Sequence, residues 1–459
     1  MDDPEFPTSD ERDGPRGPGS RRRRSRQRPI PEDVAHADTL EDGHERVIDP
    51  REAGAEIWTE NGLDLEEVDP DALKVLRRLN RYGFQAYLVG GCVRDLLIGR
   101  HPKDFDIATS ATPKQIKKLF RNSRIIGRRF RLAHIHFGDN ILEVSTFRAA
   151  AVAKEEDDAD PLIVRDNVFG RADEDARRRD FTVNALFFDI RNLEVIDFVG
   201  GMKDLRAHRI ETIGDPVTRL REDPVRMLRA ARFAGRLGFD LAEDLFRAIA
   251  EVNEDLRKAA APRLYEELQK LLDRGGARGS FDILHRSRVL DVLLPELAAH
   301  VDGPPSPLEI EPAGLWSILR SLDIFVDDGH VVSNVVLLSA LFLPLFERAL
   351  LHNGPPPEGE KPSDFDIGAL VDRILDPIAL RLQVPRRDLF RVKQILAAQR
   401  RFLARKQGRR KPSPKQVVRK EYFPDALRLF QIHARALGRF QPEVERWMGL
   451  YEEAYGRPF

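Results

Sequence analysis

Two aspartates separated by a single residue mark the most informative stretch of this chain. Asp104 and Asp106 stand within about twenty residues of the pair Gly90-Gly91. On a strand, two such carboxylates share one face, and they repel each other unless a hard cation lies between them. Mg²⁺ is usually held by one or two carboxylates together with substrate phosphates. Glycines let a triphosphate approach the backbone, and a following helix start favours anions. The combination predicts a metal-dependent nucleotidyl-transfer site.

Two further acids are candidates for completing this carboxylate group. Glu143 stands in the apolar segment 141–148, where an acid must be paired or liganded to be tolerated, unless it lies on the solvent-facing side of a strand. Asp180 follows three arginines, 177–179, whose planar guanidinium groups suit phosphate oxygens. Asp180 could therefore join the acid group, orient an arginine, or form a structural Arg–Asp pair.

A later segment has the residue types needed to recognise a base. Asp223-Pro224 is typical of a helix start, with the aspartate as the cap. Glu222, Arg226, Arg229 and Phe233 then fall on roughly one helix face. Acid and guanidinium groups on that face could bond the edge of a base while Arg229 reaches a phosphate. Taken alone, this spacing more often forms ion pairs on a surface helix.

The net charge of −1 conceals a strong asymmetry. Residues 381–420 contain fifteen Lys/Arg and one acid, Asp388, which gives +14, so the remainder carries about −15. A concentrated basic region in a near-neutral protein indicates a polyanion-binding surface. The expected RNA-binding residues in it are Arg405, Lys406, Arg409 and Arg410.

Composition also limits the compartment. The single cysteine, Cys92, excludes an intramolecular disulfide framework and a cysteine-rich zinc site. The acidic start has no apolar segment typical of a signal peptide, and the apolar run 335–346 is too short to span a bilayer. We expect a cytoplasmic protein without membrane contact.

Periodicity predicts an α/β N-terminal part, followed by an all-α remainder. Residues 1–65 are too polar to bury a core, so we expect them to be disordered. Order is expected to begin near Asp69-Pro70, a helix start, and a second helix is expected at 112–120. From Asp223 onward the pattern is helical, with breaks near 302–307 and 354–362. The expected strands are 85–89, 105–109, 131–137, 141–146, 183–190 and 194–198.

These motifs together resemble the class II branch of the polymerase-β-like nucleotidyltransferases, which contains bacterial poly(A) polymerases and CCA-adding tRNA nucleotidyltransferases. The resemblance covers roughly residues 66–440. Within the branch, the segment 125–134 looks like the element of the poly(A) polymerases. The matching motifs are Leu88-Val89-Gly90-Gly91-Cys92-Val93-Arg94-Asp95, Asp104-Phe105-Asp106, Arg178-Arg179-Asp180-Phe181-Thr182-Val183-Asn184-Ala185-Leu186 and Glu222-Asp223-Pro224-Val225-Arg226-Met227-Leu228-Arg229.

The resemblance implies a role for each motif. Asp104 and Asp106 would hold Mg²⁺, or Mn²⁺, with Asp180 or Glu143 as the third catalytic carboxylate. The residues implied to bind the nucleotide are Gly90, Gly91, Arg94, Arg179, Asn184, Glu222, Asp223, Arg226 and Arg229. The implied organisation is a catalytic α/β head with a mixed sheet at 66–215, a helical neck at 216–275 and a helical body and tail at 276–459.

The implied activity is poly(A) synthesis: transfer of AMP from ATP to RNA 3′ ends with release of pyrophosphate, in contact with the RNA-decay machinery. CCA addition to tRNA is the alternative, because the same residues would perform it.

Overall fold

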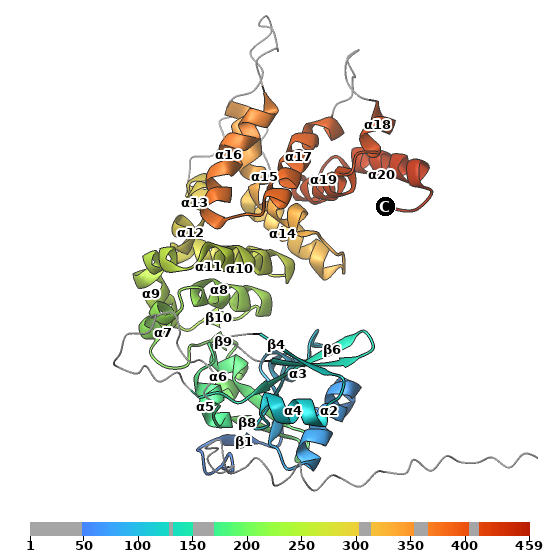
Figure 1. The fold of residues 1–459 in the computed structure, drawn as a ribbon. Helices are drawn as coiled ribbons and strands as arrows, with labels where there is room; N and C mark the ends of the chain where they lie inside the picture. The colour runs from blue at the N-terminus through green and yellow to red at the C-terminus, as the bar shows by residue number, and fades with distance from the viewer. Residues whose placement is uncertain (1–47, 128–131, 150–168, 303–313, 353–365, 404–412) are drawn as a thin grey trace, which may run out of the picture. The chain divides into compact units, whose positions relative to one another are not determined.

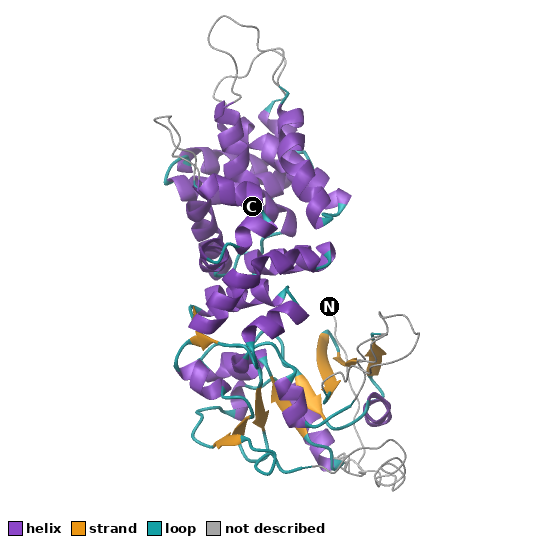
Figure 2. Ribbon diagram, turned by 90° about the vertical axis from the view of Figure 1, so that its left-hand side faces the viewer, coloured by secondary structure: helices purple, strands orange, loops and turns teal. Residues whose placement is uncertain are grey.

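The computed structural model describes residues 48–127, 132–149, 169–302, 314–352, 366–403 and 413–459 (Figure 1). Strands and short helices fill the chain up to about residue 215, and helices fill nearly all of the described remainder (Figure 2). The predicted fold class, an α/β part followed by an all-α part, is therefore confirmed.

An eight-stranded mixed sheet organises the first part, in the order β1-β8-β7-β2-β3-β6-β5-β4. Only β3 and β6 pair in parallel, and the other neighbours are antiparallel. Every residue of the central strands β2 and β7 is buried. The strands are β1 (Glu56–Trp58), β2 (Ala86–Val89), β3 (Ile107–Thr109), β4 (Ser123–Ile126), β5 (Leu132–Phe137), β6 (Asn140–Thr146), β7 (Leu186–Asp189) and β8 (Glu194–Asp197).

Helices cover this sheet and link its strands. Asp69 caps the first of them, α2, by accepting from the backbone N–H groups of Asp71 and Ala72 at 2.8 and 2.9 Å, and Pro70 takes the first helical position. Thr112 caps α4. The helices of this part are α2 (Pro70–Arg81), α3 (Gly91–Leu97), α4 (Pro113–Leu119), α5 (Ala172–Arg177) and α6 (Gly201–Arg206), with 3₁₀ turns η1 (Leu65–Glu67) and η2 (Thr182–Asn184).

The expectation of disorder up to residue 65 was wrong for the described residues from 48 onward. Strand β1 pairs antiparallel with β8, with Ile57 opposite Ile196. Its neighbour Arg51 forms an ion pair of 2.9 Å with Glu194. A strand of three residues is too short to show a clear alternation of apolar and polar residues. Its partner β8 lies far along the chain, so the local sequence gives no sign of the pairing that stabilises it.

The second part consists of packed helices around apolar cores. Helix α15 is long and apolar enough to cross a membrane by length and composition, but its residues Leu337, Leu341 and Phe346 are buried against other helices of the protein. A two-stranded parallel pair, β9 (Arg209–Ile210) and β10 (Asp240–Leu241), and η3 (Asn253–Lys258) accompany the first helices. The helices are α7 (Pro216–Glu222), α8 (Arg226–Leu237), α9 (Glu243–Val252), α10 (Ala261–Asp273), α11 (Ala277–Arg286), α12 (Val289–Leu293), α13 (Pro295–Asp302), α14 (Leu315–Asp327), α15 (Asn334–His352), α16 (Ile367–Leu382), α17 (Arg386–Leu403), α18 (Pro414–Val418), α19 (Phe423–Leu437) and α20 (Gln441–Tyr455).

Helices α8 and α11 make an unusually close crossing. A Cβ on Gly235 would lie 2.3 Å from the Ser280 hydroxyl oxygen, and a Cβ on Gly276 would lie 2.3 Å from the Gly235 carbonyl oxygen. Glycine is required at both positions because any side chain would push the backbones apart. The crossing fixes the position of α8, which forms one wall of the candidate site.

Candidate active site

The glycine turn between β2 and α3 brings the backbone to the edge of a cavity. Gly90 has φ of +76°, in the left-handed region that favours glycine. A Cβ there would lie 2.9 Å from Nη1 of Arg179 and 3.5 Å from the Asn184 carbonyl oxygen. The Gly90 N–H donates to the Leu186 carbonyl at 3.0 Å, which fixes the turn to β7. A side chain at Gly90 would therefore displace Arg179.

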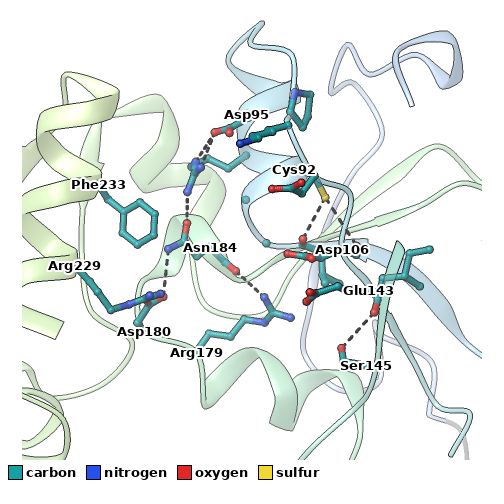
Figure 3. Close-up of a pocket in the computed structure, with 18 of the residues that line it drawn as sticks. Cys92, Asp95, Asp106, Glu143, Ser145, Arg179, Asp180, Asn184, Arg229 and Phe233 are labelled. Atoms are coloured by element: carbon teal, nitrogen blue, oxygen red, sulfur yellow. Dashed lines mark hydrogen bonds and ion pairs between the residues drawn. The ribbon is translucent and has the colours of Figure 1, made fainter. Parts of the chain in front are cut away.

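The neighbouring strand pair brings three carboxylates together. Asp104 and Asp106 stand on either side of the buried Phe105, directly before β3, and both line the cavity. Ile107 stands opposite Val144 in the parallel β3–β6 pair. One residue earlier on each strand, Asp106 and Glu143 therefore come to the same end of the sheet, and Figure 3 shows their carboxylates close to each other.

The charge of Asp106 is poorly compensated. Its carboxylate borders the cavity but has protein on most sides, and this burial raises the pKa of Asp106 to about 6. The negative charges of Glu143 and, more weakly, Asp104 act in the same direction, while the positive charge of Arg179 opposes them. The site thus holds three acids of like charge that an added cation would stabilise.

This donor set fits a divalent cation. Carboxylate oxygens are the ligands that Mg²⁺ and Mn²⁺ prefer, and a shared cation relieves their mutual repulsion. In the described parts of the chain, no three His, Cys, Asp or Glu side chains are arranged to hold a metal ion without further ligands. Substrate phosphates would have to complete the coordination, as is usual for Mg²⁺.

Asp180 lies in a different electrostatic environment on the same cavity. Burial alone would raise its pKa, but the charge of Arg229 and hydrogen bonds from Arg229, Asn184 and the Phe181 N–H hold the pKa of Asp180 below its ordinary value. Arg229 Nε donates to Asp180 Oδ2 at 2.8 Å, and Asn184 Nδ2 donates to Asp180 Oδ1 at 3.2 Å (Figure 3). Asp180 is therefore ionised and already neutralised by an arginine.

A fully buried aspartate holds the two preceding arginines. Arg179 donates to Asp175 Oδ2 from Nε and Nη2 at 3.3 and 3.1 Å, and Arg178 donates to Asp175 Oδ1 at 2.9 and 2.6 Å. Arg179 Nη1 also donates to the Asn184 carbonyl at 3.2 Å. Both guanidinium groups are thereby fixed while remaining at the cavity wall.

Arg94 is less available than the sequence suggested. It is only 2% exposed, and its guanidinium donates to Asp95 Oδ1 at 2.8 and 2.6 Å and to the Asn184 side chain. Arg94 borders the cavity, but its hydrogen bonds already connect α3 to the η2 turn.

The helix predicted to start at Asp223 begins at Arg226, three residues later. Asp223 ends α7, and a turn leads from it into α8: the Asp223 side chain accepts from the Val225 N–H at 3.3 Å, and the Asp223 carbonyl accepts from the Arg226 N–H at 3.0 Å. The cap followed by proline is found earlier, where Asp215 accepts from the Thr218 N–H at 2.8 Å ahead of Pro216.

The turn separates the two acids of the predicted base-binding segment. Asp223 lines the cavity and accepts from Arg263 at 2.8 Å. Glu222 is half-exposed and pairs with Arg219 at 2.7 Å and Arg226 at 3.1 Å. Glu222 is not among the residues that line the cavity, whereas Arg226 and Arg229 are.

The cavity, about 790 Å³ in volume, unites most of the predicted site residues. Arg178, one of the three arginines noted before Asp180, also lines it. Sequence reasoning missed four further arginines at the cavity, and of these only Arg236, which continues the helical spacing of Arg226, Arg229 and Phe233, gave a signal that could have been read. The four are Arg148, Arg236, Arg263 and Arg274. The predicted RNA-binding residues Arg405, Lys406, Arg409 and Arg410, and residues 128–131 of the segment 125–134, lie outside the described residues.

Two family models match the chain. Residues 86–211 match the model described as Poly A polymerase head domain, and residues 238–301 match the model described as Probable RNA and SrmB- binding site of polymerase A. The first match contains the glycine turn, the carboxylates and Asp180.

Whole-chain similarity agrees with these matches. Poly(A) polymerase I of Escherichia coli O6:H1 is 39% identical over 359 residues, 76% of each chain. A CCA-adding enzyme of Lactobacillus helveticus is 37% identical over 264 residues, 56% of this chain and 64% of that protein. The structure of the Bacillus stearothermophilus CCA-adding enzyme in complex with CTP is 25% identical with a TM-score of 0.55, covering 84% of this chain and 83% of that one. The chain therefore belongs to the family of bacterial poly(A) polymerases and CCA-adding nucleotidyltransferases.

Proposed function

We propose that this protein is a poly(A) polymerase: it joins AMP from ATP to the 3′-hydroxyl of RNA without a template, and pyrophosphate leaves. The observation that carries the proposal is a carboxylate group, Asp104, Asp106 and Glu143, facing fixed arginines across one cavity in a chain of this family. The similarity to a poly(A) polymerase extends over 76% of the chain, against 56% for the CCA-adding relative, which favours poly(A) synthesis.

The carboxylates would hold one or two Mg²⁺ ions, with Mn²⁺ as a substitute. Such ions lower the pKa of an attacking hydroxyl and neutralise charge on the leaving pyrophosphate. We assign Glu143 as the third catalytic carboxylate, because its charge acts on Asp106. Asp180 is better suited to position Arg229, which donates a hydrogen bond to it.

The remaining residues bind and orient the substrates. Gly90 and Gly91 leave room for a triphosphate, and Arg179 and Arg229 present guanidinium groups to its oxygens. Arg94 and Asn184 act from behind this surface by fixing the turn and Asp180. Asp223 and Arg226, which line the cavity, would hydrogen-bond the edge of adenine, and Glu222 would orient Arg226. Catalysis is then mostly positioning and charge neutralisation.

The RNA-binding region, the domain boundaries, the location and the partners of the protein are part of the same proposal. The basic region 381–420 would bind RNA, and the head, neck, and body and tail would divide near residues 215 and 275. A cytoplasmic location and contact with the RNA-decay machinery would suit the single cysteine and the RNA substrate.

The test uses purified protein, Mg²⁺ and two labelled RNAs, an oligo(A) primer and a tRNA lacking its 3′ CCA. Each RNA is incubated with ATP, CTP or both. Long tails made from ATP alone on either RNA are the expected result. Addition that stops after C, C and A, on the tRNA only, would instead identify a CCA-adding enzyme.

A further inference from the structure

Two arginines outside the proposed catalytic group meet at one end of the cavity. Arg236 follows Gly235 directly, and Arg274 ends α10 two residues before Gly276. The close approach of these two glycines brings both arginines to the cavity wall. Their side chains are 26% and 35% exposed, so a ligand can reach both guanidinium groups.

Positive charge exceeds negative charge at this end. Burial lowers the pKa of Arg236, Asp95 opposes the change, and the neighbouring charges of Arg94, Arg274 and Arg100 lower it further. Asp95 is the acid that faces this group, and Arg94 already holds it at 2.6 Å while Arg236 lies 3.3 Å away. Arg274 contacts Asp273 at 3.3 Å, an aspartate 35% exposed to solvent. Arg94 and Arg236 therefore share Asp95, Arg274 has the partly exposed Asp273, and the four guanidinium groups outnumber these two carboxylates.

The two arginines lie away from the residues that we assign to the nucleotide. Arg226, Arg229 and Arg236 share one face of α8, and the rise of an α-helix puts Arg236 roughly 15 Å along the axis from Arg226. Asp95, the partner of Arg236, lies apart from Asp106 and Glu143 in Figure 3. The cavity thus has two separated groups of arginines, and nucleotidyl transfer to RNA brings two polyanions into one site.

We propose that Arg236 and Arg274 bind a backbone phosphate of the RNA strand close to its 3′ end. The inference rests on the proposed function for the identity of the polyanion. Guanidinium groups suit phosphate because they are planar and permanently charged. Arg94 does not join them, because it is buried and fully engaged by Asp95 and Asn184; it supports Asp95, which orients Arg236.

The test compares Arg274→Gln and Arg236→Gln with the control Arg247→Gln. Arg247 belongs to α9, is 66% exposed, pairs with Glu243 and Asp244, and does not line the cavity. Binding of labelled oligo(A) is measured without ATP at several salt concentrations, and KM for ATP is measured separately. Each variant should bind RNA roughly tenfold more weakly. The slope of log Kd against log salt should fall by about 0.7, the value for one lost contact with a single strand. KM for ATP should not change.

Two results would overturn the inference. An unchanged salt slope for both variants would show that neither arginine contacts the RNA. A raised KM for ATP with unchanged RNA binding would assign the two arginines to the triphosphate. Arg274→Lys, which keeps the charge, should retain most of the salt slope, and an equal loss in this variant would indicate structural damage instead of a lost contact. RNA binding needs no turnover, so wild-type protein that binds RNA but adds no AMP would refute the proposed function alone.

Discussion

Two groups of carboxylates, one lining the cavity and one formed by Asp180 at the cavity and the buried Asp175, are in opposite electrostatic states. Asp104, Asp106 and Glu143 have like charges as neighbours, and the pKa of Asp106 rises to about 6. Asp180 and the nearby Asp175 are each bonded to arginines, and the pKa of Asp180 falls. The Glu143 carboxylate itself lies 3.4 Å from Nε2 of His134. Aspartate is thus poorly compensated at Asp106, where Arg179 opposes the neighbouring acids, and paired with arginines at Asp180 and Asp175.

The difference separates residues that can act on a substrate from residues that hold those groups in place. An ionised carboxylate already neutralised by an arginine has little to offer a metal ion, but it holds the arginine in a position where a phosphate can bind it. A carboxylate surrounded by like charges is stabilised when a cation arrives. Substitutions in the two groups should therefore have different consequences.

The largest effect is expected from Asp106→Ala. Losing a ligand for the proposed metal ions should lower AMP incorporation at least ~1,000-fold, because several kcal/mol of charge stabilisation disappear. Removing a like charge should leave the melting temperature unchanged or raise it slightly. Rates of primer extension and a thermal melt are the measurements. Turnover near the wild-type level would contradict the assignment, and Arg247→Gln serves as the inert control.

The next effect distinguishes Glu143 from Asp180. Glu143→Gln should lower kcat roughly 100-fold without weakening the fold. Asp180→Asn should act through Arg229, so combining it with Arg229→Gln should cost no more than the worse single substitution. The measurement is kcat and KM for wild-type protein, Asp180→Asn, Arg229→Gln and the double variant. Fully additive losses would show that Asp180 acts independently of Arg229.

Local sequence signals predicted those parts of the fold that local chemistry determines. Three of the seven Asp-Pro pairs in the sequence stand next to helix ends in the structure: Asp69-Pro70, Asp215-Pro216 and Asp223-Pro224. In the first two pairs the aspartate caps a helix that begins at its proline, whereas Asp223 ends α7 and precedes α8 by a turn. Pro224 donates no N–H, and Arg226 bonds back to the Arg219 carbonyl at 2.6 Å, so the chain turns there. Only the packing around the pair decides its role.

The candidate site shows the same limit. The i, i+2 spacing of Asp104 and Asp106 was readable, but the proximity of Glu143 depends on the parallel pairing of β3 with β6. Arg263 and Arg274 reach the cavity from α10 and its C-terminal end, and no motif near them in the sequence predicts a functional site. Residues brought together by tertiary packing leave no local pattern.

A smaller effect, on KM for ATP, should distinguish Asp223 from Glu222, the two acids at the end of α7. Asp223→Asn should raise KM for ATP roughly tenfold, because Asp223 lines the cavity. Glu222→Gln should change it by no more than about threefold, since Glu222 lies outside and only supports Arg226. Initial rates across ATP concentrations measure both. Equal losses would mean that Glu222 moves into the site when the nucleotide binds.

The last and smallest effect is on stability and concerns the pH dependence of the Asp180–Arg229 pair. The pKa of Asp180 is lower in the folded protein than in the unfolded chain, so its contribution is fully present above about pH 4 and is lost as pH falls through the folded pKa. Wild-type protein should exceed Asp180→Asn in unfolding free energy by roughly 1–3 kcal/mol at pH 6. The gap should narrow below pH 4, as urea unfolding at each pH would show. A difference in unfolding free energy that stays constant down to pH 2.5 would mean that the charge of Asp180 does not stabilise the fold. Asp180 would then not be a carboxylate stabilised by its arginine, and the contrast between the two carboxylate groups would fail.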